Sequence, residues 1–342
     1  MKILDDFEPY NDIWYKSCFF HAFFPVIRHF NRDILPFISN EIFIYEYNET
    51  KTDYKLGMKV FEKNSVENIL ESMDINVMTK VETNDIIGNL ISSIDNERPV
   101  IIFIDCYYES IRPDAFQKNH FPHTLLIYGY NNIDEMFYIL EHKYRDSYLY
   151  EKRTISYSDV VNCYNGFIVN LKKDKNPLTY FEYSIKSNDQ SSEKNNLFKR
   201  NICLDAFYEN LQENKKTLYN GIEDLKLFIN DYRHIVFEES LLKNNVDDLL
   251  NAFNGIINNK NLERYCVLKI FNSNYNSINL CESIINSWSF IRGIIGKYKF
   301  SSQYNLKSFE KSIEKLNEIY DLECRWYDSL FYSYDQMRDY NE

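Results

Sequence analysis

Glycine is scarce in this sequence, and its scarcity argues against several classes of function. Only 8 of the 342 residues are glycine, and neither a GxGxxG turn nor a GxxxxGK[ST] loop occurs. Those motifs bring backbone N–H groups close to the phosphates of dinucleotides and nucleoside triphosphates. The sequence therefore gives no support to chemistry driven by NAD or ATP, and we expect no cofactor.

Basic residues, paired cysteines and long apolar runs are also lacking. Lys and Arg total 39 against 51 Asp and Glu, and the formal charge of -12 disfavours nucleic acid as a partner. The 7 cysteines are odd in number and contain no CxxC pair, which is typical of free thiols in a reducing cytoplasm. The N-terminus is too acidic for a signal peptide, and no apolar run is long enough to cross a membrane. We expect a cytoplasmic protein without a membrane partner.

Residues 1–183 mix two kinds of hydrophobic pattern. Short β-branched and aromatic runs predict strands over residues 101–104, 124–128, 137–140 and 166–169. Helical spacing predicts helices over residues 19–30, 65–73, 85–94 and 158–162. This part of the chain is therefore expected to form an α+β domain.

A polar segment follows that domain. Residues 186–196, KSNDQSSEKNN, carry no apolar side chain, so we expect a linker or exposed loop over residues 184–198. Beyond it, apolar residues recur at intervals of three and four, as in Leu218, Ile222 and Leu225. This spacing predicts one apolar stripe on each helix. Residues 199–342 are therefore expected to form an all-helical bundle or cap of four or five helices.

A cysteine opens the first predicted helix. Cys18 directly precedes an apolar helical stretch. A thiol in the first turn of a helix faces unpaired N–H groups and the positive end of the helix dipole, which favour the thiolate and stabilise a nearby oxyanion. A lone cysteine at such a position is more commonly a small buried hydrophobe. The catalytic interpretation therefore depends on a histidine that can take the proton.

Two histidines enter a predicted strand about a hundred residues later. His120 and His123 lie in the segment HFPHT. Their HxxH spacing also occurs in metal sites, where Asp105 or Glu141 would supply a further ligand. Pro122 disfavours the helical turn that would bring both histidines to one ion, and no third histidine or cysteine follows at ligand spacing. We therefore expect no metal.

The order of these motifs resembles that of a known family. The segment PVIIFIDCYY (residues 99–108), the HxxH pair and the run LLIYGY (residues 125–130) together resemble the amino-terminal domain of the butirosin biosynthesis protein H family. Cys18 lies where that family has its early cysteine, and the resemblance covers about the first half of the chain. It implies a papain-like cysteine-protease-type fold and a place in natural-product biosynthesis. It also implies acyl transfer from an acyl carrier protein to an amine.

The resemblance implies a role for each residue of a triad. Cys18 would be the nucleophile and His123 the base, and Glu141, at the end of the next strand, would orient the imidazole. Asp105 is a rival for the orienting role. Papain-like enzymes have a glutamine before the nucleophile, whereas Asn11 is the only amide in residues 8–17 that would serve an oxyanion.

A second group of residues is expected to contact the substrate: Asp105, Tyr107, Tyr108, His120 and His21. An acid at the end of a strand, followed by two tyrosines, can bind a substrate amine or fix a loop. His21, one helical turn after Cys18, can tune the thiol or fill the core.

Three functions remain open at this point. The first is a cysteine-dependent acyltransferase, or a thioesterase if water replaces the amine, whose partners are an acyl carrier protein or other acyl thioester and a small amine acceptor. Its docking patch for an acidic carrier would be a basic cluster of Lys143, Arg145, Lys152 and Arg153. The second is a catalytically inactive papain-like scaffold of an assembly line. The third is a cysteine peptidase.

Overall fold

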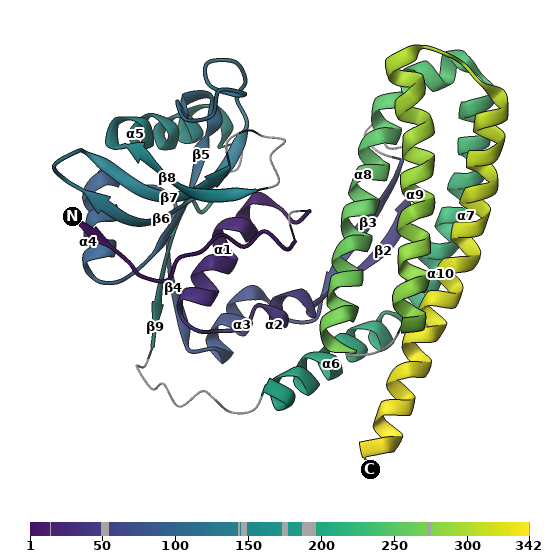
Figure 1. Ribbon diagram of the computed structural model, residues 1–342, viewed down its shortest axis with the longest axis horizontal. Helices are drawn as coiled ribbons and strands as arrows, with labels where there is room; N and C mark the ends of the chain where they lie inside the picture. The colour runs from purple at the N-terminus through teal and green to yellow at the C-terminus, as the bar shows by residue number, and fades with distance from the viewer. Residues whose placement is uncertain are drawn as a thin grey trace. The chain divides into compact units, whose positions relative to one another are not determined.

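The chain divides into two compact units. One combines residues 1–34 and 65–192, and the other combines residues 35–64 and 193–342. The computed structural model (Figure 1) describes residues 1–13, 15–48, 55–142, 144, 149–172, 177–186, 196–271 and 275–341. The sequence-based boundary placed residues 35–64 in the N-terminal domain. Their packing places them instead with the C-terminal helices, which corrects that part of the division.

The first unit is built on an antiparallel sheet in the order β4-β9-β5-β6-β7-β8, with the short β1 paired to β6. The strands are β1 (Lys2–Ile3), β4 (Ile75–Lys80), β5 (Val100–Asp105), β6 (Pro122–Asn131), β7 (Met136–His142), β8 (Tyr150–Ser156) and β9 (Tyr180–Ile185). The helical segments are α1 (Cys18–His29), α3 (Val66–Ser72), α4 (Ile86–Asp95), η1 (Cys106–Tyr108), α5 (Tyr157–Gly166) and the π-helical turn η2 (Phe167–Leu171). Helix α1 lies on one side of the sheet and α5 on the other (Figure 1). The predicted α+β class is confirmed.

Strand β5 shows why this sheet forms. Its residues alternate between the two faces of the sheet, yet Val100, Ile101 and Ile102 are all completely buried. A continuous β-branched run of this kind suits a central strand that is covered on both faces. Ile104 pairs with His123 in β6, so the ends of the two strands lie side by side. This register brings the predicted site residues to one end of the sheet.

The predicted strand over residues 166–169 is wrong. Gly166 ends α5, and the chain continues as η2. Phe167 is buried against Phe103, with ring centroids 5.4 Å apart. A short apolar run is compatible with a buried helix as well as a strand, which explains the error. Strands β4, β8 and β9 carry too few consecutive apolar residues to have been recognised.

The second unit is a helical bundle with a β-hairpin. Its elements are α2 (Leu35–Ile38), β2 (Glu41–Tyr47), β3 (Leu56–Glu62), α6 (Asn196–Glu213), α7 (Lys215–Phe237), α8 (Glu239–Ile270), α9 (Tyr275–Ser301) and α10 (Leu306–Asn341). The all-helical C-terminal region is confirmed, and the stripe residues Leu218, Ile222 and Leu225 are buried. Most of the predicted linker, residues 187–195, lies outside the described residues. In the part of the chain that the structure describes, no helix is both long and apolar enough to span a membrane.

A buried ionic cluster ties the hairpin to the bundle. Lys260 of α8 lies 2.7 Å from Glu323 and 2.9 Å from Glu263, and all three side chains are almost fully buried. The hydroxyl of Tyr45, in β2, donates to Glu323 at 2.7 Å and accepts from Trp288 at 3.1 Å. Because Lys260 faces both carboxylates, part of the desolvation cost of the cluster is offset within it. The hairpin therefore belongs to the bundle through specific polar contacts as well as apolar packing.

Candidate active site

Cys18 is the first residue of α1, one position before the predicted start of that helix. Ser17 precedes it in an extended conformation, and the Ser17 side chain makes no capping hydrogen bond with any described residue. The first turn has no acidic residue, and Arg28 and His29 occupy the last turn. The first N–H groups of the helix and the positive end of its dipole are therefore available to stabilise negative charge at the thiol.

The Cys18 thiol contacts His123, the second residue of β6. Burial alone raises the pKa of this thiol, but the hydrogen bond and positive charge of His123, with smaller contributions from Thr124, lower the pKa to about 7. A thiol with such a pKa is partly thiolate at neutral pH, which is the nucleophilic form. At four other cysteines nothing outweighs burial, and the pKa of each thiol is raised: Cys106, Cys163, Cys281 and Cys324.

His123 is held between the thiol and a buried acid. Its Nε2 lies 2.9 Å from Oε2 of Glu141 in β7, and the two side chains are 5% and 0% exposed. With Nε2 occupied, Nδ1 is the ring nitrogen left for Cys18. Burial lowers the pKa of His123, but the Glu141 charge and the hydrogen bonds to Cys18 and Glu141 raise it well above its ordinary value. The structure therefore brings Cys18, His123 and Glu141 together in one contact series.

Glu141 is itself fixed by two donors. Its Oε1 accepts the backbone N–H of His142 at 2.7 Å and the Arg112 guanidinium at 3.4 Å. Burial raises the pKa of Glu141, but the charge and hydrogen bond of His123, with a smaller contribution from the Arg112 charge, outweigh burial and lower the pKa. Arg112 is completely buried and is held by two 2.9 Å hydrogen bonds to Asp114. Sequence reasoning missed Arg112, because nothing in its local pattern shows that a loop arginine is buried.

A metal ion does not suit this group. His123, Glu141 and His142 offer ligand atoms that all lie within 4.8 Å of one another. Nε2 of His142, however, already accepts from Arg112 at 2.9 Å, while Nδ1 donates to the main-chain oxygen of Tyr144. Burial and the Arg112 charge lower the pKa of His142 to about 4, so this histidine is neutral. A guanidinium inside the cluster would repel a divalent cation, and the polar atoms are satisfied without one.

Asn11 is bonded to the backbone of β8. Its side-chain amide donates to the main-chain oxygen of Tyr150 at 3.2 Å, and its oxygen accepts from the Tyr150 N–H at 2.9 Å. Asn11 therefore fixes the N-terminal segment to β8, and the contacts give no support to an oxyanion role. The backbone N–H of Cys18, at the start of α1, is the better candidate donor for an oxyanion.

His21 is a core histidine. It is 5% exposed, its Nδ1 lies 3.3 Å from the main-chain oxygen of Tyr10, and its ring stacks on Tyr150 with centroids 4.5 Å apart. Tyr150 also packs on His142 at 4.8 Å. Its ring is therefore held between two imidazoles, and the charges of Glu141 and Cys18 act on its hydroxyl. Burial and those charges raise the pKa of Tyr150, which sequence reasoning had not singled out.

Asp105 hydrogen-bonds to His120, whereas His123 bonds to Glu141. Oδ2 of Asp105 lies 2.7 Å from Nδ1 of His120, and its Oδ1 accepts the N–H of Tyr107 at 3.1 Å. Tyr107 stacks on His120 with centroids 4.2 Å apart, and Tyr108 meets the same imidazole edge-on at 6.1 Å. Four of the predicted substrate-binding residues therefore form one cluster, separate from the triad and on the same end of the β5–β6 pair.

Comparison with protein-family models and with curated proteins finds no match for this chain. The functional argument therefore depends on the geometry of the site.

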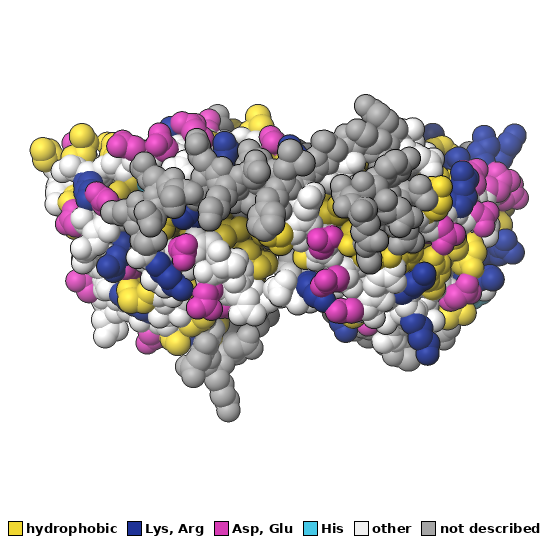
Figure 2. All heavy atoms as spheres, turned by 90° about the horizontal axis from the view of Figure 1, so that it is seen from below, with side chains coloured by type: hydrophobic (Ala, Val, Ile, Leu, Met, Phe, Trp, Pro, Cys, Tyr) yellow, Lys and Arg dark blue, Asp and Glu magenta, His cyan; other side chains and the backbone are white. Residues whose placement is uncertain are grey.

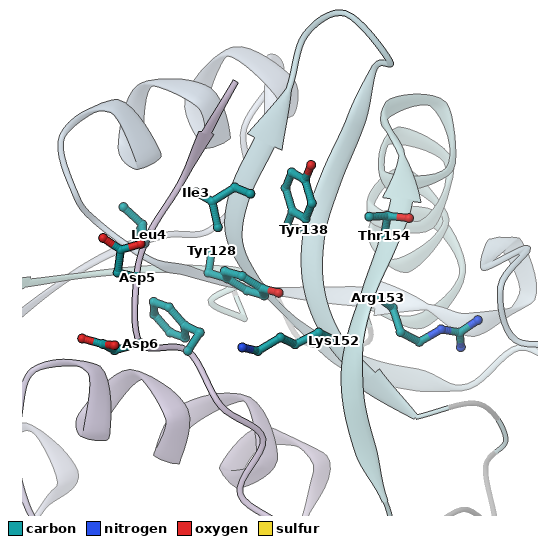
Figure 3. Close-up of a pocket in the computed structure, with 10 residues that line it drawn as sticks. Ile3, Leu4, Asp5, Asp6, Tyr128, Tyr138, Lys152, Arg153 and Thr154 are labelled. Carbon is teal, nitrogen blue, oxygen red and sulfur yellow. The ribbon is translucent and has the colours of Figure 1, made fainter.

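A cavity of about 530 Å³ lies between the N-terminal segment and the sheet of the same unit (Figure 3). Residues 3–7 form one wall, and side chains of the strands, among them Tyr128, Tyr138 and Lys152, form the other. Neither Cys18 nor His123 lines it, so it is not the reaction centre. Lys152 is two residues from Tyr150 in β8, and alternate residues of a strand share one face. Strand β8 therefore contributes both to the cavity and, through Tyr150, to the surroundings of the site.

The basic cluster expected from the sequence is described only in part. Lys143 and Arg145 lie outside the described residues. Lys152 pairs with Glu8, and Arg153 donates to two main-chain oxygens. On the face shown in Figure 2, acidic and basic side chains are interspersed.

Proposed function

We propose that this chain is a cysteine-dependent acyltransferase, or a thioesterase when water is the acceptor, that works through an acyl-Cys18 intermediate. The observation that carries the proposal is the contact series from the partly exposed Cys18 thiol to the buried His123 and from His123 to the buried Glu141, with the thiol pKa near 7. A structural cysteine needs neither an imidazole nor a carboxylate, whereas a cysteine nucleophile is activated by an adjacent base that a third group orients.

The chemistry follows from the positions of these groups. The Cys18 thiolate attacks the carbonyl carbon of an acyl thioester, and the oxygen that gains negative charge lies toward the N–H groups at the start of α1. The carbon–sulfur bond of the donor breaks, and its thiolate takes the proton of the His123 imidazolium. Glu141 stabilises that imidazolium before transfer and orients the ring. An amine or water then releases the acyl group from Cys18.

The fold supports a papain-like assignment at the level of the site. A nucleophile opens a helix, while base and acid lie on neighbouring antiparallel strands, β6 and β7. A glutamate takes the orienting position, and no glutamine precedes Cys18 in residues 8–17. The substrates that fit this proposal are an acyl carrier protein or other acyl thioester and a small amine. The seven free cysteines agree with a cytoplasmic location.

A panel of acyl thioesters and short peptides tests the proposal. The protein is incubated with each compound, and peptide mass spectrometry locates any acyl mass. We expect acylation of Cys18 by thioesters, its loss in Cys18→Ala, and its retention in Cys324→Ala, since Cys324 is the other partly exposed cysteine. Cleavage of peptides without acylation by thioesters would favour a peptidase. No reaction with any compound would favour an inactive scaffold.

A further inference from the structure

The two acids at this end of the sheet serve two different histidines. Glu141 bonds to Nε2 of the buried His123, whereas Asp105 bonds to Nδ1 of His120. Since Nδ1–H of a neutral His120 donates to the carboxylate, its Nε2 carries the lone pair. The His120 side chain is 43% exposed, and no described residue hydrogen-bonds to that Nε2. The second pair therefore presents a basic nitrogen to solvent.

The surroundings of Asp105 hold this pair in one geometry. Asp105 is completely buried, and its Oδ2 also accepts from Asn170 at 3.2 Å. Asn170 in turn lies 3.5 Å from the hydroxyl of Tyr108. A Cβ at Gly166 would lie 2.3 Å from the Tyr108 ring, so the absence of a side chain there lets the ring pack against the end of α5. The carboxylate is thus fixed from β5, η1 and η2 together.

The pair is close to the triad along the chain. His120 is three residues before His123, so their Cα atoms are at most about 11 Å apart. Asp105 pairs with Pro122 and Ile104 pairs with His123 in the sheet. The Asp105–His120 pair and the triad therefore lie at the same end of the β5–β6 pair.

We propose that His120 is the general base that activates the acceptor, and that Asp105 is its positioning residue; this inference rests on the proposed acyl transfer. The amine nitrogen attacks the carbonyl carbon of acyl-Cys18 and forms a carbon–nitrogen bond. The carbon–sulfur bond breaks, and its electron pair returns to the Cys18 sulfur as thiolate. The surplus amine proton goes to Nε2 of His120 and from there to solvent.

His123 is poorly placed for this second proton. It is 5% exposed, and both ring nitrogens face protein groups, Glu141 and Cys18. His123 gives its proton to the donor thiolate in the first step, and it regains one from solvent as the Cys18 thiolate is released. Two histidines allow the donor step and the acceptor step to use separate proton carriers.

The test separates formation of acyl-Cys18 from its discharge. The acyl thioester that labels Cys18 is used to load the protein, and intact mass spectrometry follows loss of the acyl group to 2-aminoethanol or to hydroxylamine. His120→Ala should load at the wild-type rate but discharge to 2-aminoethanol about 10²–10⁴-fold more slowly, the range for loss of a general base. Hydroxylamine is unprotonated at neutral pH and needs little help from a base, so discharge to it should be unchanged. Added imidazole should restore discharge of His120→Ala to 2-aminoethanol.

A matched control is His29→Ala. His29 also bonds through Nδ1, to the main-chain oxygen of Asp5, and also stacks on an aromatic ring, that of Phe7. This variant should load and discharge like wild type. Wild-type discharge by His120→Ala, or equal loss of loading and discharge, would overturn the inference while leaving acyl-Cys18 established. Failure of the wild-type protein to load would instead overturn the proposed function and the inference with it.

Discussion

Nε2 of His123 lies 2.9 Å from Oε2 of Glu141, and this contact is buried at the junction of β6 and β7. It holds the imidazole so that the other ring nitrogen faces Cys18. The carboxylate stays ionised because Arg112 and the His142 N–H stabilise it from the opposite side. The activation of the thiol therefore depends on a carboxylate that does not touch it.

Replacement of each acid distinguishes the two acid–histidine pairs. Glu141→Gln should slow formation of acyl-Cys18 by two to four orders of magnitude, about the cost of losing the orienting acid of a triad. Asp105→Asn should leave that step within about twofold and slow only discharge to an amine. Single-turnover loading with an acyl thioester measures formation of acyl-Cys18 in both variants. Loss of the acyl group to an added amine measures its discharge. The reverse ranking would make Asp105 the acid of the triad.

The buried Glu109 should make folding stability depend on pH. Its two oxygens have no hydrogen-bond partner from a nitrogen or oxygen atom among the described residues. Burial, and then the nearby Glu141 charge, raise the pKa of Glu109 to about 8. The folded state therefore binds one more proton than the unfolded state between the ordinary pKa and about 8. The free energy of unfolding is therefore highest below the ordinary pKa of Glu109. It falls as the pH rises toward 8, by at most about 1.4 kcal/mol per pH unit.

Glu109→Gln removes that titration. The variant should lose less stability than wild type between pH 5 and pH 8, as measured by urea unfolding at each pH. Glu71→Gln, at an exposed acid that pairs loosely with Lys186, is the control and should follow wild type. Parallel pH profiles for wild type and Glu109→Gln would show that Glu109 is ionised in the folded protein.

Lys260 should be essential to the helical unit. Lys260→Met leaves Glu323 and Glu263 buried without their cation, which should cost about 3–5 kcal/mol of unfolding free energy. Lys299→Met, in the exposed pair with Asp247 on the same bundle, should cost no more than about 1 kcal/mol. Chemical denaturation followed by circular dichroism measures both. Equal, small losses would mean that the buried cluster adds nothing beyond packing.

Local pattern was sufficient for the elements that form the sheet centre. The run that predicted a strand over residues 101–104 gives β5 with one residue more at each end, because β-branched residues buried on both faces leave little choice of structure. The hairpin was assigned to the other unit because its bonds are remote in sequence. Tyr45 and Glu323, for example, are separated by 278 positions.

Some residues of the candidate site could be found from local sequence pattern, and others could not. Cys18, His123 and Glu141 lie at or near the ends of their elements, where sequence pattern, helped by the family resemblance, located them. Arg112 and Tyr150 were missed because their roles arise from burial and stacking that no local pattern shows. The rival acids could not be ranked from sequence, since the choice between them depends on which histidine each one meets.

Competitive alkylation of the cysteines tests the central claim most directly. The native protein is treated with limiting iodoacetamide at a series of pH values, and peptide mass spectrometry follows each of the seven cysteines. The account predicts that Cys18 reacts first at neutral pH, with a rate that rises with pH through a midpoint near 7, where its thiolate forms. In His123→Ala that midpoint should move up, because burial then acts without the imidazolium. Faster labelling of another cysteine, or an unchanged Cys18 midpoint in His123→Ala, would contradict the account.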